Sequence, residues 1–143
     1  MRAGDMVTLK GRHVEKIEET ESLGEAIDRM ARKNIGAVLV INRAGRPSGI
    51  VSERDVMRVM AGAPTGIRQR PVHQVMTAEL VTCHPDETVD ELLDLMTERR
   101  FRHVPVMDGD ELLGLLSIGD VVKHRMREVK AEAEALRMYI AGT

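Results

Sequence analysis

The chain has 143 residues, with 21 Lys and Arg against 23 Asp and Glu, and a formal net charge of −2. This near-balance gives no general electrostatic attraction to nucleic acid or to an anionic membrane surface. Phe101 and Tyr139 are the only aromatic residues, so stacking platforms for single-stranded nucleic acid are not expected either.

The N-terminal residues 1–5 lead into no apolar segment of the kind found in a secretory signal. No apolar run elsewhere approaches the roughly 20 residues needed to span a bilayer. A soluble, cytoplasmic protein with no membrane association is therefore the expectation.

The first structural unit reads as β-α-β-β-α. Residues 14–17 form the expected leading strand, and Ser22-x-x-Glu25 is a capping box that starts a helix. A β-rich run follows over 37–41, then the turn residues 42–45 and a short strand over 48–51. A second helix is expected after the S-x-x-D segment at 52–55. Residues 62–66, with two glycines and a proline, then break the pattern.

The second half repeats the first. Residues 88–96 align with 22–30 at an offset of 66, with apolar residues falling on apolar ones, and 104–107 align with 38–41 at the same offset. One residue is lost in the turn, after which 114–121 align with 49–56 at an offset of 65. Thr88-x-x-Glu91 is the matching capping box, and 80–83 is the matching leading strand.

The duplication predicts an α/β fold made of two pseudo-symmetric β-α-β-β-α repeats packed face to face, since neither half alone has much core. The expected boundaries are a first repeat over 7–63, a linker over 64–74, a second repeat over 75–126 and a C-terminal helical tail over 127–143.

The tail carries an apolar stripe whose members recur at spacings of four and three: Val122, Met126, Val129, Ala133, Leu136 and Ile140. This spacing is typical of a seam between two helices. The stripe either docks on its own domain or forms a dimer contact, and the sequence does not separate these two readings.

The duplicated S-x-x-D segments, Ser52 to Asp55 and Ser117 to Asp120, allow two interpretations. Each serine can simply cap a helix whose first turn holds the aspartate. The same geometry suits a ligand, because a helix N-terminus attracts phosphate and a carboxylate can accept hydrogen bonds from the two hydroxyls of a ribose.

Two basic residues, Arg102 and His103, precede a core strand in the second repeat, where Arg102 could bind a phosphate or carboxylate and His103 could add a pH-sensitive charge. They could equally be solvated. The matching positions in the first repeat are Gly36 and Ala37, so two sites built on the repeats would not be equivalent. Cys83, the only cysteine, is expected to be a small buried residue, and no disulfide or zinc site follows from it.

The ordered set of segments at 35–42, 49–56, 75–77, 102–106 and 114–123 resembles a pair of cystathionine-β-synthase (CBS) domains of the stand-alone prokaryotic type. The resemblance implies a regulatory module that binds an adenosine-containing ligand, such as AMP, ATP, NAD(H) or S-adenosylmethionine, in a cleft between the repeats. It also implies a homodimer, and a regulated partner that is a separate protein.

By the same resemblance, Asp55 and Asp120 would hold ribose, while Ser52 and Ser117 would hold phosphate together with Arg102, His103 and, more weakly, Arg54. Backbone groups around Ile17 and Cys83 would flank the adenine. No metal site and no catalytic cofactor are expected.

Catalysis is not expected, because the five histidines are scattered and the chain has no H-E-x-x-H, G-x-S-x-G or P-loop motif. The alternative function is a ligand-free interaction or scaffold module that acts through its dimer and C-terminal helix. Nucleic-acid binding is a further possibility besides the regulatory module and the scaffold module, and it would rest on scattered arginines and lysines alone.

Overall fold

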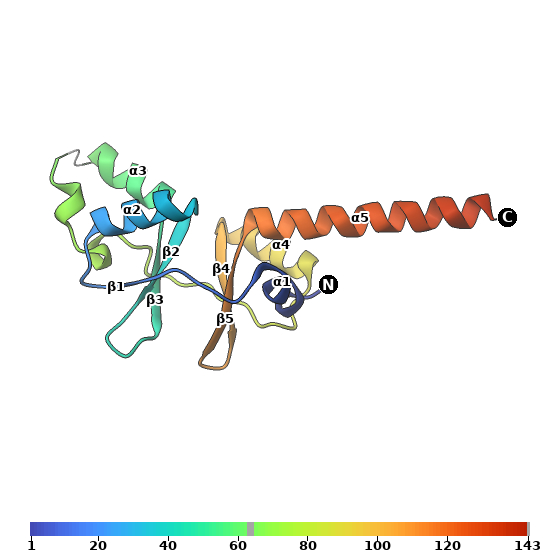
Figure 1. The fold of residues 1–143 in the computed structure, drawn as a ribbon, viewed down its shortest axis with the longest axis horizontal. Coiled ribbons are helices and arrows are strands. Elements are labelled where there is room, and N and C mark those ends of the chain that lie inside the picture. Colours follow the sequence, from blue (N-terminus) through green and yellow to red (C-terminus); the bar gives the residue numbers. More distant parts are fainter. Residues whose placement is uncertain (63–64, 143) are drawn as a thin grey trace. The chain divides into compact units, whose positions relative to one another are not determined.

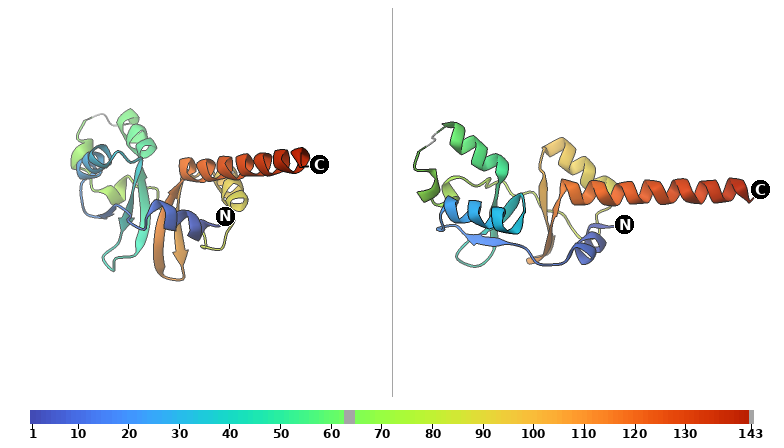
Figure 2. Two further views of the ribbon diagram at one scale, coloured as in Figure 1. Left: turned by 45° about the vertical axis from the view of Figure 1, so that its right-hand side comes forward. Right: turned by 45° about the horizontal axis from the view of Figure 1, so that its top comes forward.

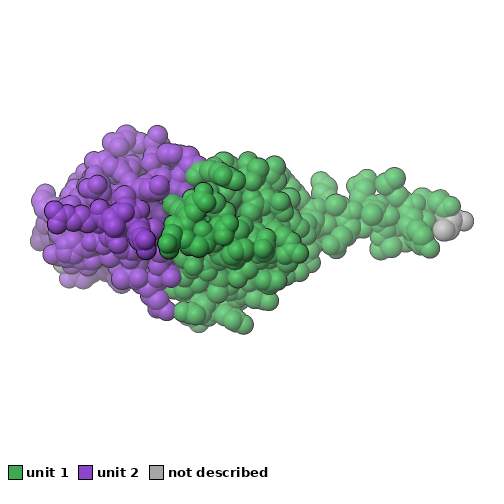
Figure 3. Space-filling view, turned by 90° about the horizontal axis from the view of Figure 1, so that it is seen from below, with its two compact units in different colours: residues 1–12, 81–143 green, residues 13–80 purple. Residues whose placement is uncertain are grey.

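A computed structural model describes residues 1–62 and 65–142. These residues form two compact units, shown separately coloured in Figure 3: one is residues 13–80, and the other joins residues 1–12 to those that follow Leu80. Residues 63, 64 and 143, where the predicted first repeat ends, the linker begins and the tail ends, lie outside the described residues.

The unit of residues 13–80 is built on a three-stranded sheet (Figure 1). Strand β1 (Lys16–Glu18) pairs in parallel with β2 (Ala37–Ile41), which pairs antiparallel with β3 (Pro47–Ser52). Helices α2 (Leu23–Lys33) and α3 (Glu53–Gly62) and the short 3-10 helices η1 (Ile67–Gln69) and η2 (Val72–Gln74) complete it. Its core holds aliphatic side chains from the strands and from α2, together with Ile67, Val72 and Val75.

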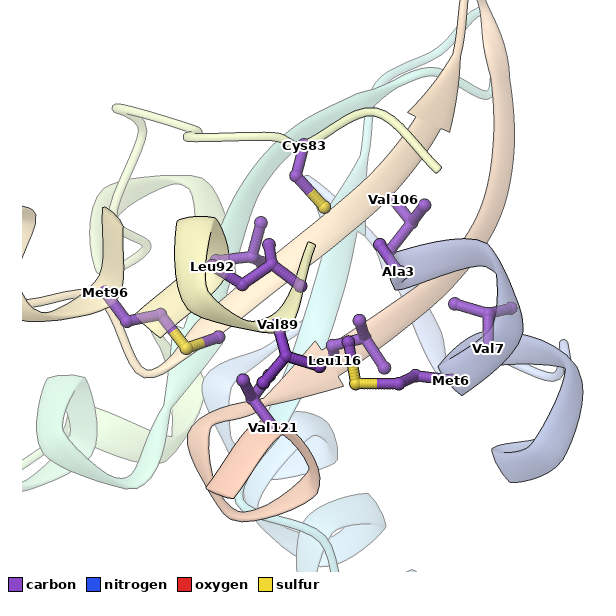
Figure 4. Packing of buried hydrophobic residues seen from close by; sticks show 11 residues of the cluster. Ala3, Met6, Val7, Cys83, Val89, Leu92, Met96, Val106, Leu116 and Val121 are labelled. Atoms are coloured by element: carbon purple, nitrogen blue, oxygen red, sulfur yellow. The ribbon is translucent and has the colours of Figure 1, made fainter. Parts of the chain in front are cut away.

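The other unit contains α1 (Ala3–Lys10), α4 (Val89–Arg99), the antiparallel pair β4 (His103–Asp108) and β5 (Glu111–Ser117), and the long helix α5 (Ile118–Ala141). Figure 4 shows its core, in which Ala3, Met6 and Val7 of α1 lie beside Leu116 and Val106 of the two strands. Helix α1 was not predicted from the sequence.

The predicted caps explain where α2 and α4 begin. The hydroxyls of Ser22 and Thr88 accept hydrogen bonds from the backbone N–H of Glu25 and Glu91, each at 3.2 Å. The carboxylate of Glu25 lies 3.3 Å from Arg29 instead of completing a capping box. Both helices end at a residue with positive φ, Asn34 and Arg100, which the offset of 66 also aligns.

One predicted strand is absent and one is shifted. Residues 80–83 form no strand among the described residues, because only Cys83 pairs, as an isolated bridge with Val106. The strand expected over 14–17 lies at Lys16–Glu18. Otherwise the predicted α/β class is confirmed, with small sheets, flanking helices and a long C-terminal helix.

The segment at the start of each repeat packs against strands of the other repeat, and we call residues 1–12 and 72–80 the leading segments. Thr77 exchanges two backbone hydrogen bonds with Ile50 of β3, at 2.9 and 3.0 Å. At the matching place on β5, the Lys10 ammonium donates to the carbonyl of Leu115 at 2.8 Å. The compact units therefore do not follow the order of the repeats along the chain.

Two equivalent glycines make room for the leading segments. A Cβ on Gly49 would lie 2.6 Å from the sulfur of Met76, and a Cβ on Gly114 would lie 2.6 Å from Cγ1 of Val7. Both distances are far shorter than van der Waals contact. Only glycine at these positions lets the leading segments lie directly on β3 and β5.

Helix α5 leaves its unit after its second turn. Val121 and His124 are buried, whereas every member of the apolar stripe from Val122 to Ile140 is exposed. Figures 1 and 2 show the helix running beyond α4 and the β4–β5 pair. The prediction that the stripe docks on its own domain is therefore wrong for this chain, and its role as a dimer contact stays a prediction.

Candidate functional site

Both S-x-x-D segments form reciprocal helix caps. In the first, the Asp55 carboxylate accepts from the Ser52 backbone N–H at 2.8 Å and from the Ser52 hydroxyl at 3.0 Å. In the second, the Asp120 carboxylate accepts from the same groups of Ser117, at 2.8 and 2.9 Å. The capping interpretation therefore holds for each helix start, and the surroundings of the two aspartates decide what else each can do.

Asp55 is enclosed and fully engaged. Its side chain is 3% exposed, and its second oxygen, Oδ1, accepts from Arg58 at 2.8 Å and from the Thr77 hydroxyl at 2.9 Å. Since Oδ2 already serves both groups of Ser52, both oxygens are taken by the protein. A ribose could bind here only by displacing Thr77 or Arg58.

Asp120 is more open. Its side chain is 26% exposed, and Oδ2 accepts from Ser117 and from Lys10, whose ammonium lies 2.6 Å away. Among the described residues, none donates a hydrogen bond to Oδ1. Burial acts to raise the pKa of Asp120, but the hydrogen bonds from Lys10 and Ser117 together outweigh it and hold this pKa below its usual value. Asp120 therefore presents an ionised carboxylate with one oxygen free to accept.

The backbone of Arg102 and His103 adjoins the start of α5. The Arg102 carbonyl accepts from the first N–H of α5 at Ile118, at 2.8 Å, and His103 pairs with Ser117 across β4 and β5. Burial lowers the pKa of His103, and the positive charges of Lys10 and Arg102 lower it further, while Asp120 opposes them. We call Lys10, Arg102, His103 and Asp120 the Asp120 cluster, after the charges that act on His103.

The first repeat has the same backbone frame without the cations. The Gly36 carbonyl accepts from Glu53 at 3.0 Å, and Ala37 pairs with Ser52 across β2 and β3. Arg58 is the basic side chain on Asp55, and it is held there by the Val75 carbonyl as well. The two S-x-x-D positions are therefore structurally equivalent but chemically different.

A family model of the CBS domain matches this chain twice, over residues 6–62 and 72–127. The chain belongs to the CBS-domain family. The predicted tandem pair is thereby confirmed.

Solved CBS structures share this fold over most of the chain. A CBS-domain containing protein from Agrobacterium tumefaciens is 40% identical, with a TM-score of 0.83 over 87% of this chain and 92% of that one. A CBS domain protein from Pyrobaculum aerophilum, solved in complex with AMP, is 26% identical, with a TM-score of 0.74 over 84% of this chain and 89% of that one.

A mitochondrial CBS domain-containing protein of Arabidopsis thaliana, CBSX3, is 32% identical over 126 residues, which is 85% of this chain. The chain spans 61% of the length of that relative. Its similarity to this chain therefore covers the CBS pair and not the whole of the longer protein.

Of the remaining predicted site residues of the CBS pair, Arg54 and Ile17 belong to the unit of residues 13–80, and Cys83 belongs to the other unit. Arg54 is exposed on α3, and Ile17 is buried in the core of residues 13–80. Cys83 is buried as expected, and its backbone N–H and carbonyl both bond to β4, at 3.0 and 2.9 Å. Burial, with the nearby Glu87 carboxylate, raises the pKa of its thiol to about 12.

Sequence reasoning missed three residues that contact the CBS aspartates: Lys10, Arg58 and Thr77. One signal was available, because residues 9–11 align with 75–77 at the offset of 66, which marks Lys10 as part of a repeated leading segment. Each leading segment contacts the aspartate of the other repeat, and no local pattern in the sequence indicates this contact.

The described residues contain no group of three His, Cys, Asp or Glu side chains arranged to hold a metal ion. In the same part of the chain, none of the helices has both the length and the apolar character needed to cross a membrane.

Proposed function

We propose that the chain is a regulatory module that binds an adenosine-containing ligand at Asp120. The observation that carries this proposal is the unequal state of the two S-x-x-D carboxylates: Asp55 has both oxygens engaged by the protein, whereas Asp120 keeps one free within the Asp120 cluster. The binding of AMP by the Pyrobaculum aerophilum relative supports adenosine as the class of ligand.

Each residue near Asp120 has a role in this proposal. The Asp120 carboxylate accepts the ribose hydroxyls, and the first turn of α5 with Ser117 offers donors to a phosphate. Arg102 and His103 add cationic or hydrogen-bonding groups. The chain transmits the bound state to a separate protein and carries out no catalysis. A homodimer and a cytoplasmic location belong to the same proposal.

The test is thermal unfolding of the full chain with AMP, ADP, ATP, NAD, NADH and S-adenosylmethionine. A ligand at about a hundred times its dissociation constant adds about 2.7 kcal/mol to the free energy of unfolding, which raises Tm by several degrees. The shift should disappear in Asp120→Ala. It should persist in the control Asp28→Ala, which removes a half-exposed acid whose Arg68 partner lies 2.8 Å away.

The absence of any shift with all six ligands would refute the proposal, as would a shift that Asp120→Ala leaves unchanged. An S-x-x-D pair that bound no nucleotide would then be a pair of helix caps.

The exposed stripe on α5 favours the second candidate, a scaffold module. In that case the oligomeric state in solution would change on Leu136→Glu and would be insensitive to adenine nucleotides, as measured by light scattering after gel filtration. Leu136 is 59% exposed in the single chain, so this variant should fold normally.

A further inference from the structure

Lys10 contacts one of the two Asp120 oxygens that could accept a hydrogen bond from a ribose. Its ammonium lies 2.6 Å from Oδ2, and Oδ2 also accepts two hydrogen bonds from Ser117. Both hydroxyls of a ribose are best held by both oxygens of one carboxylate. A ribose hydroxyl that approaches Oδ2 therefore competes with Lys10, whereas a hydroxyl that approaches Oδ1 does not.

The Lys10 contact is easily broken. The Lys10 side chain is 41% exposed, and an ion pair at this exposure stabilises a protein only weakly because water solvates both charges. Lys10 is also the last residue of α1, so its side chain can turn away without disturbing the helix. By contrast, the Asp55 carboxylate beside Arg58 is 3% exposed and is also held by Thr77.

The displaced ammonium would need a new anionic partner. Lys10 also donates a hydrogen bond to the Leu115 carbonyl, at 2.8 Å, but that carbonyl carries no net charge to replace the Asp120 carboxylate 2.6 Å away. An anionic group on the ligand would supply the missing charge. A ligand without a phosphate would instead leave the Lys10 ammonium with the Leu115 carbonyl and no anionic partner.

We infer that Lys10 makes the Asp120 site selective for adenosine that carries a phosphate over uncharged adenosine. This inference rests on the proposed function of the site. Lys10 is the counter-ion of Asp120 in the structure, and it transfers to the ligand phosphate when the ribose takes its place. Lys10 therefore competes with a ribose hydroxyl for Oδ2, and only a phosphorylated ligand offers the displaced ammonium an anionic partner.

The test compares the binding of AMP and adenosine by titration calorimetry on the full chain and on Lys10→Met. Wild type should bind AMP at least about tenfold more tightly than adenosine, because a charge-assisted hydrogen bond of this kind corresponds to roughly that factor. In Lys10→Met, AMP should bind about tenfold more weakly, while adenosine should bind equally well or more tightly. If Lys10 had a purely structural role, Lys10→Met would weaken the binding of AMP and of adenosine alike.

Lys33→Met is the matched control, since Lys33 is another surface lysine, 57% exposed, whose ammonium lies 3.7 Å from the Glu15 carboxylate. It should leave both affinities unchanged. Lys10→Arg should keep most of the preference for AMP. Unfolding of each variant without ligand checks that it is folded.

Two results would overturn the inference while leaving the proposed function intact: equal affinities of wild type for AMP and adenosine, or equal weakening of both by Lys10→Met. Failure of wild type to bind AMP would also overturn the inference, and it would overturn the proposed function only if none of the other five ligands of the panel bound.

Discussion

The contact between Gly114 and Val7 should show strong coupling in stability. Gly114→Ala places a methyl group 2.6 Å from Cγ1 and 2.9 Å from Cγ2 of Val7. The separation must grow by about an ångström to reach ordinary contact, and overpacking of this kind costs about 2 kcal/mol. Val7→Ala removes two methyl groups from a side chain that is 2% exposed, which also costs about 2 kcal/mol.

The two changes should compensate each other. In the double variant, the new methyl of residue 114 fills part of the space left by the Val7 methyls, and its nearest remaining neighbour there is Cβ of residue 7, at 3.3 Å. The total loss should be about 2 kcal/mol in place of the additive value of about 4 kcal/mol. The coupling energy is then about 2 kcal/mol, well above the scatter of a double-mutant cycle.

Urea denaturation followed by circular dichroism measures all four proteins, since the chain has no tryptophan to report by fluorescence. Gly119→Ala is the control, because the nearest atom to its new methyl is the Ser117 hydroxyl at 3.6 Å. It should be neutral or slightly stabilising, as expected for Gly→Ala within a helix. Additive losses in the cycle would refute the packing of α1 on β5.

Three further predictions follow from groups already described. Asp55→Ala should lower the free energy of unfolding in urea by about 3 kcal/mol, because the Thr77 hydroxyl and the cap of α3 lose their acceptor. Asp120→Ala should lower it by only about 1 kcal/mol, because Asp120 is more exposed. Equal losses would contradict the difference in burial between the two carboxylates. Cys83, with a pKa of about 12, should resist iodoacetamide at pH 8 until urea unfolds the chain, and rapid labelling of the native protein would contradict this. Because the pKa of His103 is lowered in the folded protein, its imidazole takes up a proton at a higher pH in the unfolded chain than in the folded one. Stability should therefore fall as the pH drops below 6.5, and His103→Gln should reduce the slope of that fall.

The repeat and the local elements could be predicted from the sequence because their signals are short-range. Ser22 and Thr88 mark the starts of α2 and α4 within one turn, and the apolar alternation of β2 and β4 lies in consecutive residues. Helix α1 was missed because its buried residues, Ala3, Met6 and Val7, pack against strands that lie about a hundred residues further along the chain.

In the candidate site, too, short-range features were visible in the sequence and long-range contacts were not. The S-x-x-D pattern and the basic pair at Arg102 and His103 were visible in the sequence. The difference between Asp55 and Asp120 was not, because it depends on Thr77, Arg58 and Lys10, and two of these come from leading segments that cross to the other repeat. The exposure of the α5 stripe was also beyond the sequence, since its spacing suits an internal contact as well as an external one.

The crossing of the leading segments separates the order of synthesis from the order of folding. Residues 13–80 form one uninterrupted unit, which is complete when Leu80 has left the ribosome. Residues 1–12 are made earlier, yet Met6 and Val7 find the strand that covers them only after Leu116 has been added. Until then α1 is an apolar segment without its core, so a nascent chain would expose it longest, and the completion of β5 would end that exposure.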